Sequence, residues 1–246
     1  MDVVISVDVE QDCPPFLHSY SGVANGGLQY LMDIFEQTEI KASFFVGADV
    51  IKLYPNLIQK LETRGHEIGC HGLNHRRFDQ MSYHESEANI RDATRILGQY
   101  LSHPVRSFRA PNLHFPREYL SILKAQGYVV DSSIARYKEP SLCFNPLKRI
   151  WVEDKIIRIP VTITSFCLRF DCSSFLHWIS LLSLNPLVLF VHPWEFIDFT
   201  KAPIRWDCRF RTGLYARRVL LKLIHFLKRQ NAKFKTIAQI ADDYMK

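Results

Sequence analysis

Short apolar runs alternate with segments of helical periodicity along this chain. Strands are predicted at residues 3–7, 42–46, 66–70, 105–108, 128–130, 155–159 and 187–191. Helices are predicted at residues 28–37, 49–64, 82–101, 116–126, 175–184, 213–230 and 237–244. Repeated alternation of strand and helix is typical of a parallel sheet covered by helices. We therefore expect an α/β fold, a distorted or incomplete (β/α) barrel, that forms a single domain over residues 1–246.

Residues able to do chemistry stand at the carboxyl ends of several predicted strands. They are Asp8, Glu10, Asp12, His71, His75, Arg109, Asp131 and His192. In parallel α/β folds the loops at the carboxyl ends of the strands share one face, so residues distant in sequence meet there. Polar residues scattered at random would seldom all fall at that end. The pattern indicates an enzyme, and specifically a metalloenzyme.

The pair His71 and His75 has the spacing of metal ligands in a loop directly after a strand. Imidazole suits zinc and similar divalent ions, and two histidines plus one carboxylate leave coordination positions for water and substrate. The alternative is two loop histidines that bond to the backbone. Asp8, Glu10 and Asp12 would repel each other without a compensating cation, which favours the metal site, and Arg109 is a natural bidentate partner for one carboxylate.

His192 ends an apolar run and is followed by Pro193-Trp194-Glu195. An isolated histidine in this position is usually a satisfied core residue. Here Asp131 is a candidate orienting carboxylate, which favours a general acid.

Charge and cysteine usage limit the partners and the compartment. The net charge is +6, and basic residues concentrate between 217 and 235. A solvated helix face explains this cluster, although a contact with an anionic membrane surface stays open. No nucleic-acid motif is present, so we expect no nucleic-acid partner. The chain starts with Met-Asp directly before a strand, and its six cysteines form no CxxC pair, so we expect a cytoplasmic protein.

Taken together, these motifs resemble the polysaccharide deacetylase, or NodB-homology, family of carbohydrate esterases. Ser-Val-Asp8-Val-Glu10 is similar to the first family motif, and His71-Gly-Leu-Asn-His75 to the second. Arg109-Ala-Pro111 resembles the third, Asp131-Ser-Ser the fourth, and Val-His192-Pro-Trp194-Glu the fifth. The similarity runs from about residue 3 to 240, with the motifs in the family's order.

The resemblance implies a role for each motif. Asp8 matches the catalytic base, His71 and His75 the metal histidines, and His192 the general acid, with Arg109 and Asp131 as supporting catalytic residues. Substrate contacts are expected from four residues: Asp12, Pro111, Asn112 and Trp194.

Two positions depart from the family pattern. The family has adjacent aspartates in its first motif, whereas Val9 separates Asp8 from Glu10 here, so Glu10 or Asp12 is the metal carboxylate. Glu10 is preferred because one intervening residue returns it to Asp8's face of an extended chain. Position 112 is Asn where many members carry Tyr, which leaves the substrate contacts there open.

The implied reaction is hydrolysis of an N-acetyl group from an amino sugar, such as an N-acetylglucosamine-type glycan or a lipid- or nucleotide-linked precursor. The implied cofactor is one divalent ion, Zn²⁺ first and Co²⁺, Ni²⁺ or Fe²⁺ as alternatives. Two other functions stay open: a metal-dependent amidohydrolase acting on a small non-sugar amide or cyclic imide, and a non-catalytic glycan-binding protein. The sequence does not fix the oligomeric state.

Overall fold

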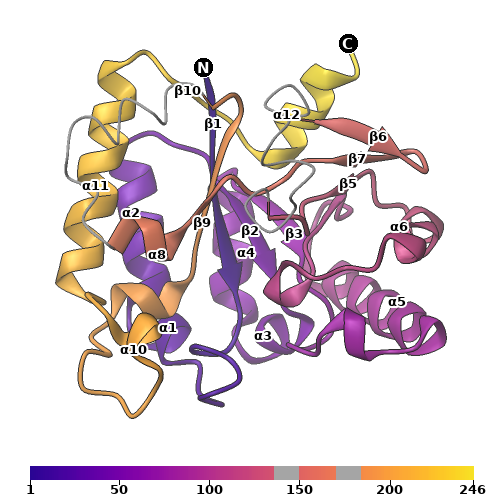
Figure 1. Ribbon diagram of the computed structural model, residues 1–246, viewed down its shortest axis with the longest axis horizontal. Coiled ribbons are helices and arrows are strands. Elements are labelled where there is room, and N and C mark those ends of the chain that lie inside the picture. The colour runs from indigo at the N-terminus through magenta and orange to yellow at the C-terminus, as the bar shows by residue number, and fades with distance from the viewer. Residues whose placement is uncertain (136–149, 170–183) are drawn as a thin grey trace. The chain divides into compact units, whose positions relative to one another are not determined.

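The structure, a computed structural model, describes residues 1–135, 150–169 and 184–246 (Figure 1). The predicted helix at 175–184 falls almost wholly outside the described residues. The described chain divides into two compact units. The first unit comprises Met1–Ala42 and Ile163–Lys235, and the second comprises Ser43–Thr162 and Thr236–Lys246.

The first unit is built on a parallel ladder around strand β1. β1 pairs in parallel with β9 and with β10, and β9 also pairs in parallel with β8. β1 is buried from its second residue, Val3, onward, and the hydroxyl of the buried Ser6 donates to the carbonyl of Leu189 at 2.9 Å. The elements of this unit are β1 (Asp2–Val9), α1 (Ser21–Ala24), α2 (Gly27–Gln37), β8 (Ile163–Thr164), α8 (Ser165–Arg169), β9 (Leu187–Val191), η5 (Pro193–Phe196), α10 (Trp206–Arg209), α11 (Leu214–Arg229) and β10 (Lys233–Phe234).

The second unit continues the same strand–helix alternation. β2, β3, β4, β5 and β7 pair successively in parallel, and β6 pairs antiparallel with β7. Its strands are β2 (Ser43–Val46), β3 (Glu67–Cys70), β4 (Ser107–Phe108), β5 (Val130–Asp131), β6 (Trp151–Glu153) and β7 (Ile156–Arg158). Its helices are α3 (Ala48–Leu53), α4 (Pro55–Thr63), η1 (Phe78–Gln80), α5 (Tyr83–Tyr100), η2 (Pro111–Leu113), η3 (Arg117–Tyr119), α6 (Leu120–Ala125) and α12 (Ile237–Tyr244).

Helix boundaries follow local capping chemistry. Helix α5 begins at Ser82, as predicted, with a capping box in which the side chains of Ser82 and Glu85 each bond to the other's backbone amide. The single helix predicted over 49–64 is wrong, because Pro55 has no N–H to continue it and starts α4 at its first position. The predicted helix over 116–126 begins as the 3-10 turn η3 and becomes α-helical only from Leu120.

Strand registers align the carboxyl ends within each unit. In the first unit Val7 lies opposite Val191, so Asp8 and His192 follow on neighbouring strands. In the second unit Cys70 lies opposite Phe108, which in turn lies opposite Asp131. Among the described residues, no helix has the length and apolarity needed to cross a membrane.

Candidate functional site

The first unit carries a buried acidic and imidazole cluster where β1 and β9 end. Asp8 is 3% exposed and Glu10 is 6% exposed. His192 Nε2 lies 3.4 Å from Glu10 Oε1, and His192 Nδ1 lies 2.7 Å from Glu195 Oε1. Because Glu195 accepts from Nδ1–H, the Nε2 atom is the one left to exchange a proton with a reacting group.

Glu195 is itself held by a buried arginine. Arg169 Nε lies 2.9 Å from Glu195 Oε2, and both side chains are almost fully buried. Burial raises the pKa of Glu195, but the charge of Arg169 and the hydrogen bond from His192 outweigh burial and lower the pKa overall. Glu195 is therefore a carboxylate that orients the His192 ring.

The same carboxylates act on the proton affinity of His192. Burial lowers the pKa of His192, whereas the hydrogen bond to Glu195 and the charges of Glu10, Glu195 and Asp8 raise it to about 9. With this pKa, His192 carries a proton at neutral pH.

Two glycines let the helices of the first unit pack directly on the His-Pro-Trp-Glu turn. A Cβ at Gly22 would lie 2.3 Å from the backbone nitrogen of Trp194, and a Cβ at Gly27 would lie 2.1 Å from the carbonyl oxygen of Pro193. Any larger residue would push α1 and α2 off η5. Glycine at these positions therefore fixes the backbone that carries His192.

The second unit supplies the two histidines after β3. His71 is 2% exposed, and its Nδ1 lies 2.8 Å from the carbonyl oxygen of Arg109. Since a carbonyl only accepts, Nδ1 carries the proton and the lone pair of neutral His71 is on Nε2. This tautomer is the one that a metal ligand needs.

The loop between the histidines is held from two sides. Gly72 has φ of +83°, and its carbonyl accepts from the amide of Ala48 at 3.0 Å. The buried side chain of Asn89 on α5 accepts from the amide of Leu73 at 2.9 Å. The sequence did not predict this contact, because a polar residue within a helix gives no indication that it binds the loop between His71 and His75. The ring centroids of His71 and His75 lie 6.2 Å apart.

Cys70 packs behind this loop. It is fully buried, and burial raises the pKa of its thiol to about 11, so it stays protonated.

Arg109 is fully buried in the second unit. Its guanidinium donates to the backbone carbonyl of Ser132 at 3.2 Å and to its hydroxyl at 2.9 Å, and it stacks 4.1 Å above the ring of Phe45. These contacts hold the guanidinium rigidly. The predicted role of Arg109 toward a catalytic carboxylate stays a prediction.

Asp131 does not have the predicted role of orienting His192. Its Oδ2 lies 2.9 Å from Nε of Arg158, and its Oδ1 accepts from the hydroxyl of Ser133. Asp131 therefore anchors the Asp-Ser-Ser loop, where the Ser133 hydroxyl also accepts from the amide of Ala110. The carboxylate that contacts His192 Nδ1 is that of Glu195. The turn of η5 brings Glu195, three residues after His192 in the chain, next to the His192 ring.

Asp12 is buried and holds the loop that precedes α1. Its carboxylate accepts from the hydroxyl of Ser19 at 2.7 Å and from the backbone amides of Ser21 and Gly22 at 2.5 and 2.8 Å. Both oxygens of Asp12 are thereby engaged in closing the loop before α1, and the choice between Glu10 and Asp12 as the metal carboxylate stays a prediction.

The other predicted substrate contacts differ in exposure. Trp194 is only 5% exposed, stacks on the His192 ring with centroids 5.1 Å apart, and packs with Cys13 and Ile204. It therefore supports His192 and does not form an open stacking rim. Pro111 is buried at the start of η2, whereas Asn112 is exposed with φ of +58°.

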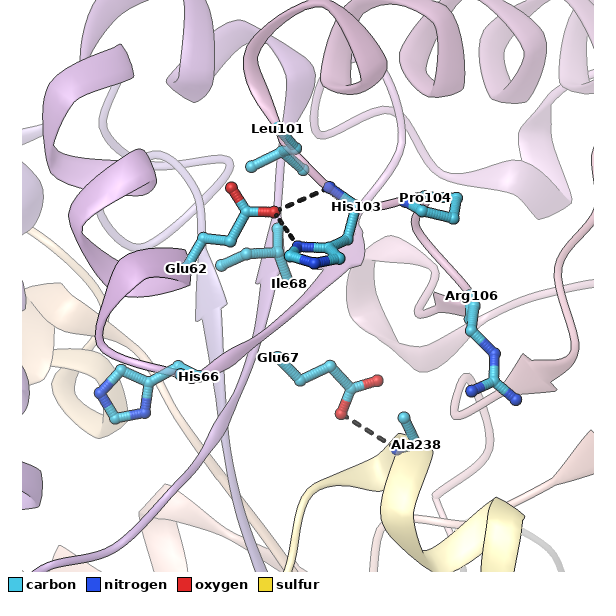
Figure 2. A pocket seen from close by; sticks show the side chains of 10 residues that line it. Glu62, His66, Glu67, Ile68, Leu101, His103, Pro104, Arg106 and Ala238 are labelled. Carbon is cyan, nitrogen blue, oxygen red and sulfur yellow. Dashed lines mark hydrogen bonds and ion pairs between the residues drawn. The ribbon is translucent and has the colours of Figure 1, made fainter.

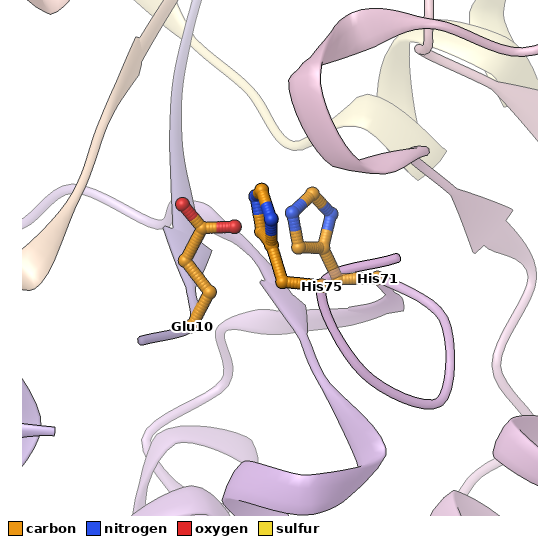
Figure 3. Close-up of side chains that lie close together, drawn as sticks. All are labelled: Glu10, His71 and His75. Carbon is orange, nitrogen blue, oxygen red and sulfur yellow. The ribbon is translucent and has the colours of Figure 1, made fainter. Parts of the chain in front are cut away.

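Figure 3 draws Glu10 of the first unit with His71 and His75 of the second unit, three described residues that are candidate metal ligands. Each offers one ligand atom, a carboxylate oxygen or an imidazole nitrogen. Two imidazoles and one carboxylate form a ligand set found in catalytic zinc sites. The donor chemistry therefore fits a divalent ion.

A pocket of about 290 Å³ lies elsewhere in the second unit, where β3 begins (Figure 2). Glu67 in its wall accepts from the hydroxyls of Ser43 and Ser107 and from the amide of Ala238. Glu62 accepts from His103. The polar groups of this pocket are engaged in structural contacts, and His71 follows the opposite end of β3.

In both units, parallel ladders carry histidines or carboxylates at the carboxyl ends of their strands, an arrangement typical of α/β enzymes. Residues 12–130 match the family model named polysaccharide deacetylase. This match supports a NodB-type polysaccharide deacetylase, and the fold matches the incomplete (β/α) barrel of that family, as the sequence predicted.

Known relatives show the same similarity in sequence and fold. A peptidoglycan-N-acetylglucosamine deacetylase from Bacillus cereus is 26% identical over 40% of this chain, and the match spans 46% of that protein, less than half its length. A structure described as a polysaccharide deacetylase from Mycobacterium smegmatis has a TM-score of 0.74 at 17% identity, covering 98% of this chain and 89% of that one. A carbohydrate esterase family 4 pseudoenzyme from Bacillus anthracis has a TM-score of 0.63 at 15% identity, covering 98% and 65%. A pseudoenzyme therefore shares this fold, so the fold alone does not decide whether a protein is active. That depends on the residues at the site.

Proposed function

We propose that this protein is a metal-dependent hydrolase that removes the N-acetyl group from an amino sugar. The substrate class is an N-acetylglucosamine-type unit, in a glycan or in a lipid- or nucleotide-linked precursor, and the proposed compartment is the cytoplasm. The family supports deacetylation. The observation that carries the proposal is the His71 tautomer, because the hydrogen bond from Nδ1 to the Arg109 carbonyl leaves Nε2 as a ligand atom.

Glu10, His71 and His75 would hold the divalent ion, with zinc as the first choice. When bound, such an ion polarises the amide carbonyl and lowers the pKa of water. The hydrogen bond from His71 Nδ1 to the Arg109 carbonyl leaves Nε2 free of its proton, and Glu10 would supply a carboxylate oxygen.

The remaining residues move protons. Asp8 accepts a proton from the attacking water as the new carbon–oxygen bond forms. His192 donates a proton from Nε2 to the amine nitrogen as the carbon–nitrogen bond breaks, which releases acetate and a free amino sugar. Glu195 keeps the ring in the orientation and tautomer for this transfer, and Arg169 keeps Glu195 ionised.

The test combines metal analysis with acetate release from acetylated sugars and small amides. We expect about one divalent ion per chain, lost in the His71→Ala/His75→Ala double variant. Asp8→Asn should retain metal and lose roughly 100- to 10,000-fold in kcat, because it removes the base. Asp154→Asn, at an exposed turn position, is the matched control and should keep full activity.

Each contrary result points elsewhere. Retained activity in Asp8→Asn would reject Asp8 as the base. Release from a cyclic imide but from no acetylated sugar would favour the amidohydrolase alternative. A wild-type protein that binds no zinc, cobalt or nickel yet still binds sugar would favour a non-catalytic glycan-binding protein.

A further inference from the structure

The loops of the first unit carry a surface of aromatic and basic side chains that are exposed or half-buried. It consists of Phe16, Arg205, Trp206, Phe210, Arg211 and Tyr215, which we call the aromatic–basic patch. The guanidinium carbon of Arg205 lies 5.8 Å from the ring centroid of Phe16, and Trp206 and Phe210 have centroids 6.3 Å apart. Arg211 lies 5.0 Å from the Phe210 ring and 4.6 Å from the Tyr215 ring. These contacts form two groups, Phe16 with Arg205 and the rings of Trp206, Phe210 and Tyr215 with Arg211, and the groups adjoin in the chain at Arg205 and Trp206.

Large apolar side chains in and beside this patch face solvent. Phe16 is 45% exposed, Trp206 is 58% exposed, and Leu214, which precedes Tyr215, is 68% exposed. Exposed aromatic side chains of this size, gathered in one place, mark a binding surface rather than a core.

The patch lies in a strongly basic segment. Residues 198–222 contain seven basic residues and two acidic ones. One of the two acids, Asp207, pairs with the patch residue Arg205. Lys201 and Arg209 beside the patch are exposed. The excess of positive charge complements an anionic partner.

The backbone beneath the patch is anchored. The buried side chain of Arg169 donates to the carbonyls of Asp207 at 3.1 Å, Cys208 at 3.0 Å and Phe210 at 2.5 Å. Ile204 packs inward against Trp194 in the same segment. The interior at this point is already filled, so Trp206 is held outward by a rigid support.

We propose that the aromatic–basic patch docks this protein on the surface of a lipid bilayer that contains anionic lipids. Tryptophan and phenylalanine favour the interface between headgroups and acyl chains, and arginine and lysine bind anionic headgroups. The patch combines both requirements on one anchored surface. Its loops follow β1 and β9, the strands that end at Asp8 and His192, so docking brings this end of the first unit to the bilayer.

The experiment is sedimentation of the full chain with vesicles of phosphatidylcholine, with and without phosphatidylglycerol. The wild type should bind only the vesicles that contain phosphatidylglycerol, and added salt should release it. The charge reversal Lys201→Glu/Arg209→Glu should weaken binding by roughly 25-fold or more, since each basic residue near the surface contributes about fivefold. The apolar double variant Phe16→Ser/Trp206→Ser should also weaken it.

Matched controls keep the proposal falsifiable. Leu53→Ser/Val152→Ser removes apolar side chains that are 57% and 54% exposed in the second unit, and Lys60→Glu/Lys124→Glu reverses exposed charges there. Both controls should bind like the wild type, and circular dichroism should show every variant folded.

Three results would overturn the proposal. In the first, the patch variants bind as tightly as the controls. In the second, the wild type binds neither vesicle or binds both equally. In the third, the wild type is a dimer that Trp206→Ser dissociates while vesicle binding does not change; the patch would then be an interface between copies of this chain.

Discussion

Replacing Glu195 by glutamine tests whether Glu195 orients the His192 ring, because the substitution leaves His192 itself in place. The change keeps the volume of the side chain but removes the charge that faces Arg169 at 2.9 Å and the ionised acceptor that faces His192 Nδ1 at 2.7 Å. Loss of one partner of a buried ion pair costs about 3–5 kcal/mol. Arg169 retains its three backbone carbonyl acceptors, so we expect a value near the lower end, about 3 kcal/mol. For a chain of this size that lowers the Tm by roughly 6–12 °C.

The activity of Glu195→Gln should fall more than its stability alone explains. Removal of a carboxylate that orients a catalytic imidazole costs between about 10²-fold and 10⁴-fold in kcat. Steady-state kinetics below the Tm of the variant measures this loss, and KM should change little because Glu195 is 1% exposed and does not reach substrate. Metal content should stay at the wild-type level.

The pH profile supplies a readout that a merely structural role would not move. Glu195 is among the groups that raise the pKa of His192 to about 9, so a neutral glutamine lowers that pKa. The protonated acid is then lost at lower pH, and the alkaline limb of kcat/KM moves to lower pH.

Asp131→Asn is the matched control, because Asp131 also forms a buried ion pair, with Arg158. It should lose comparable stability while it keeps most of its kcat and an unshifted alkaline limb. If Asp131→Asn shifts the limb and Glu195→Gln does not, Asp131 orients the general acid after all, and the assignment of Glu195 is wrong.

Two further predictions concern packing and pH. Gly27→Ala should destabilise the protein by about 1–3 kcal/mol in denaturant titration, because its Cβ would lie 2.1 Å from the Pro193 carbonyl oxygen. Gly98→Ala in α5, where a Cβ meets nothing within 4 Å, should stabilise it by about 0.5–1 kcal/mol, and equal effects would contradict the close approach at Gly27. For Glu62, burial raises its pKa, but hydrogen bonds from the Ser102 and His103 amides and the His103 ring outweigh burial and lower it. The ionised form therefore stabilises the fold above the unfolded pKa, and this contribution is lost as pH falls through the lower folded pKa. Glu62→Gln should lower the Tm at pH 7 and not at pH values below the folded pKa; an equal loss at both would refute the linkage.

The predicted elements were accurate where a pattern is local. The capping box at Ser82 and Glu85 and the helix at 237–244 agree with the structure, since the residues that make these features are neighbours in sequence. The end of α3 and the start of α4 at Pro55 also depend on local sequence. The prediction missed this boundary because the helical spacing of apolar residues continues on both sides of Pro55.

Assignments that depend on contacts between distant residues were less accurate. Asp131 and Glu195 are both carboxylates at strand ends, and sequence alone could not decide which one contacts His192 Nδ1. The decision comes from Arg158, which pairs with Asp131, and from the turn of η5, which returns Glu195 to the ring. Likewise, only the folded loop before α1 shows that both oxygens of Asp12 bind backbone amides or a hydroxyl.

By itself, the sequence indicated the resemblance to the family, the strand–helix alternation and the candidate set of residues able to do chemistry, because spacing along the chain encodes all three. The tertiary structure decided the tautomer of His71, the partner of His192, the burial of Trp194 and the exposure of Trp206. Each of these depends on which backbone carbonyl, carboxylate or neighbouring ring lies within a few ångströms. That proximity arises from the pairing of strands and the packing of loops far apart in sequence, so no local pattern encodes it.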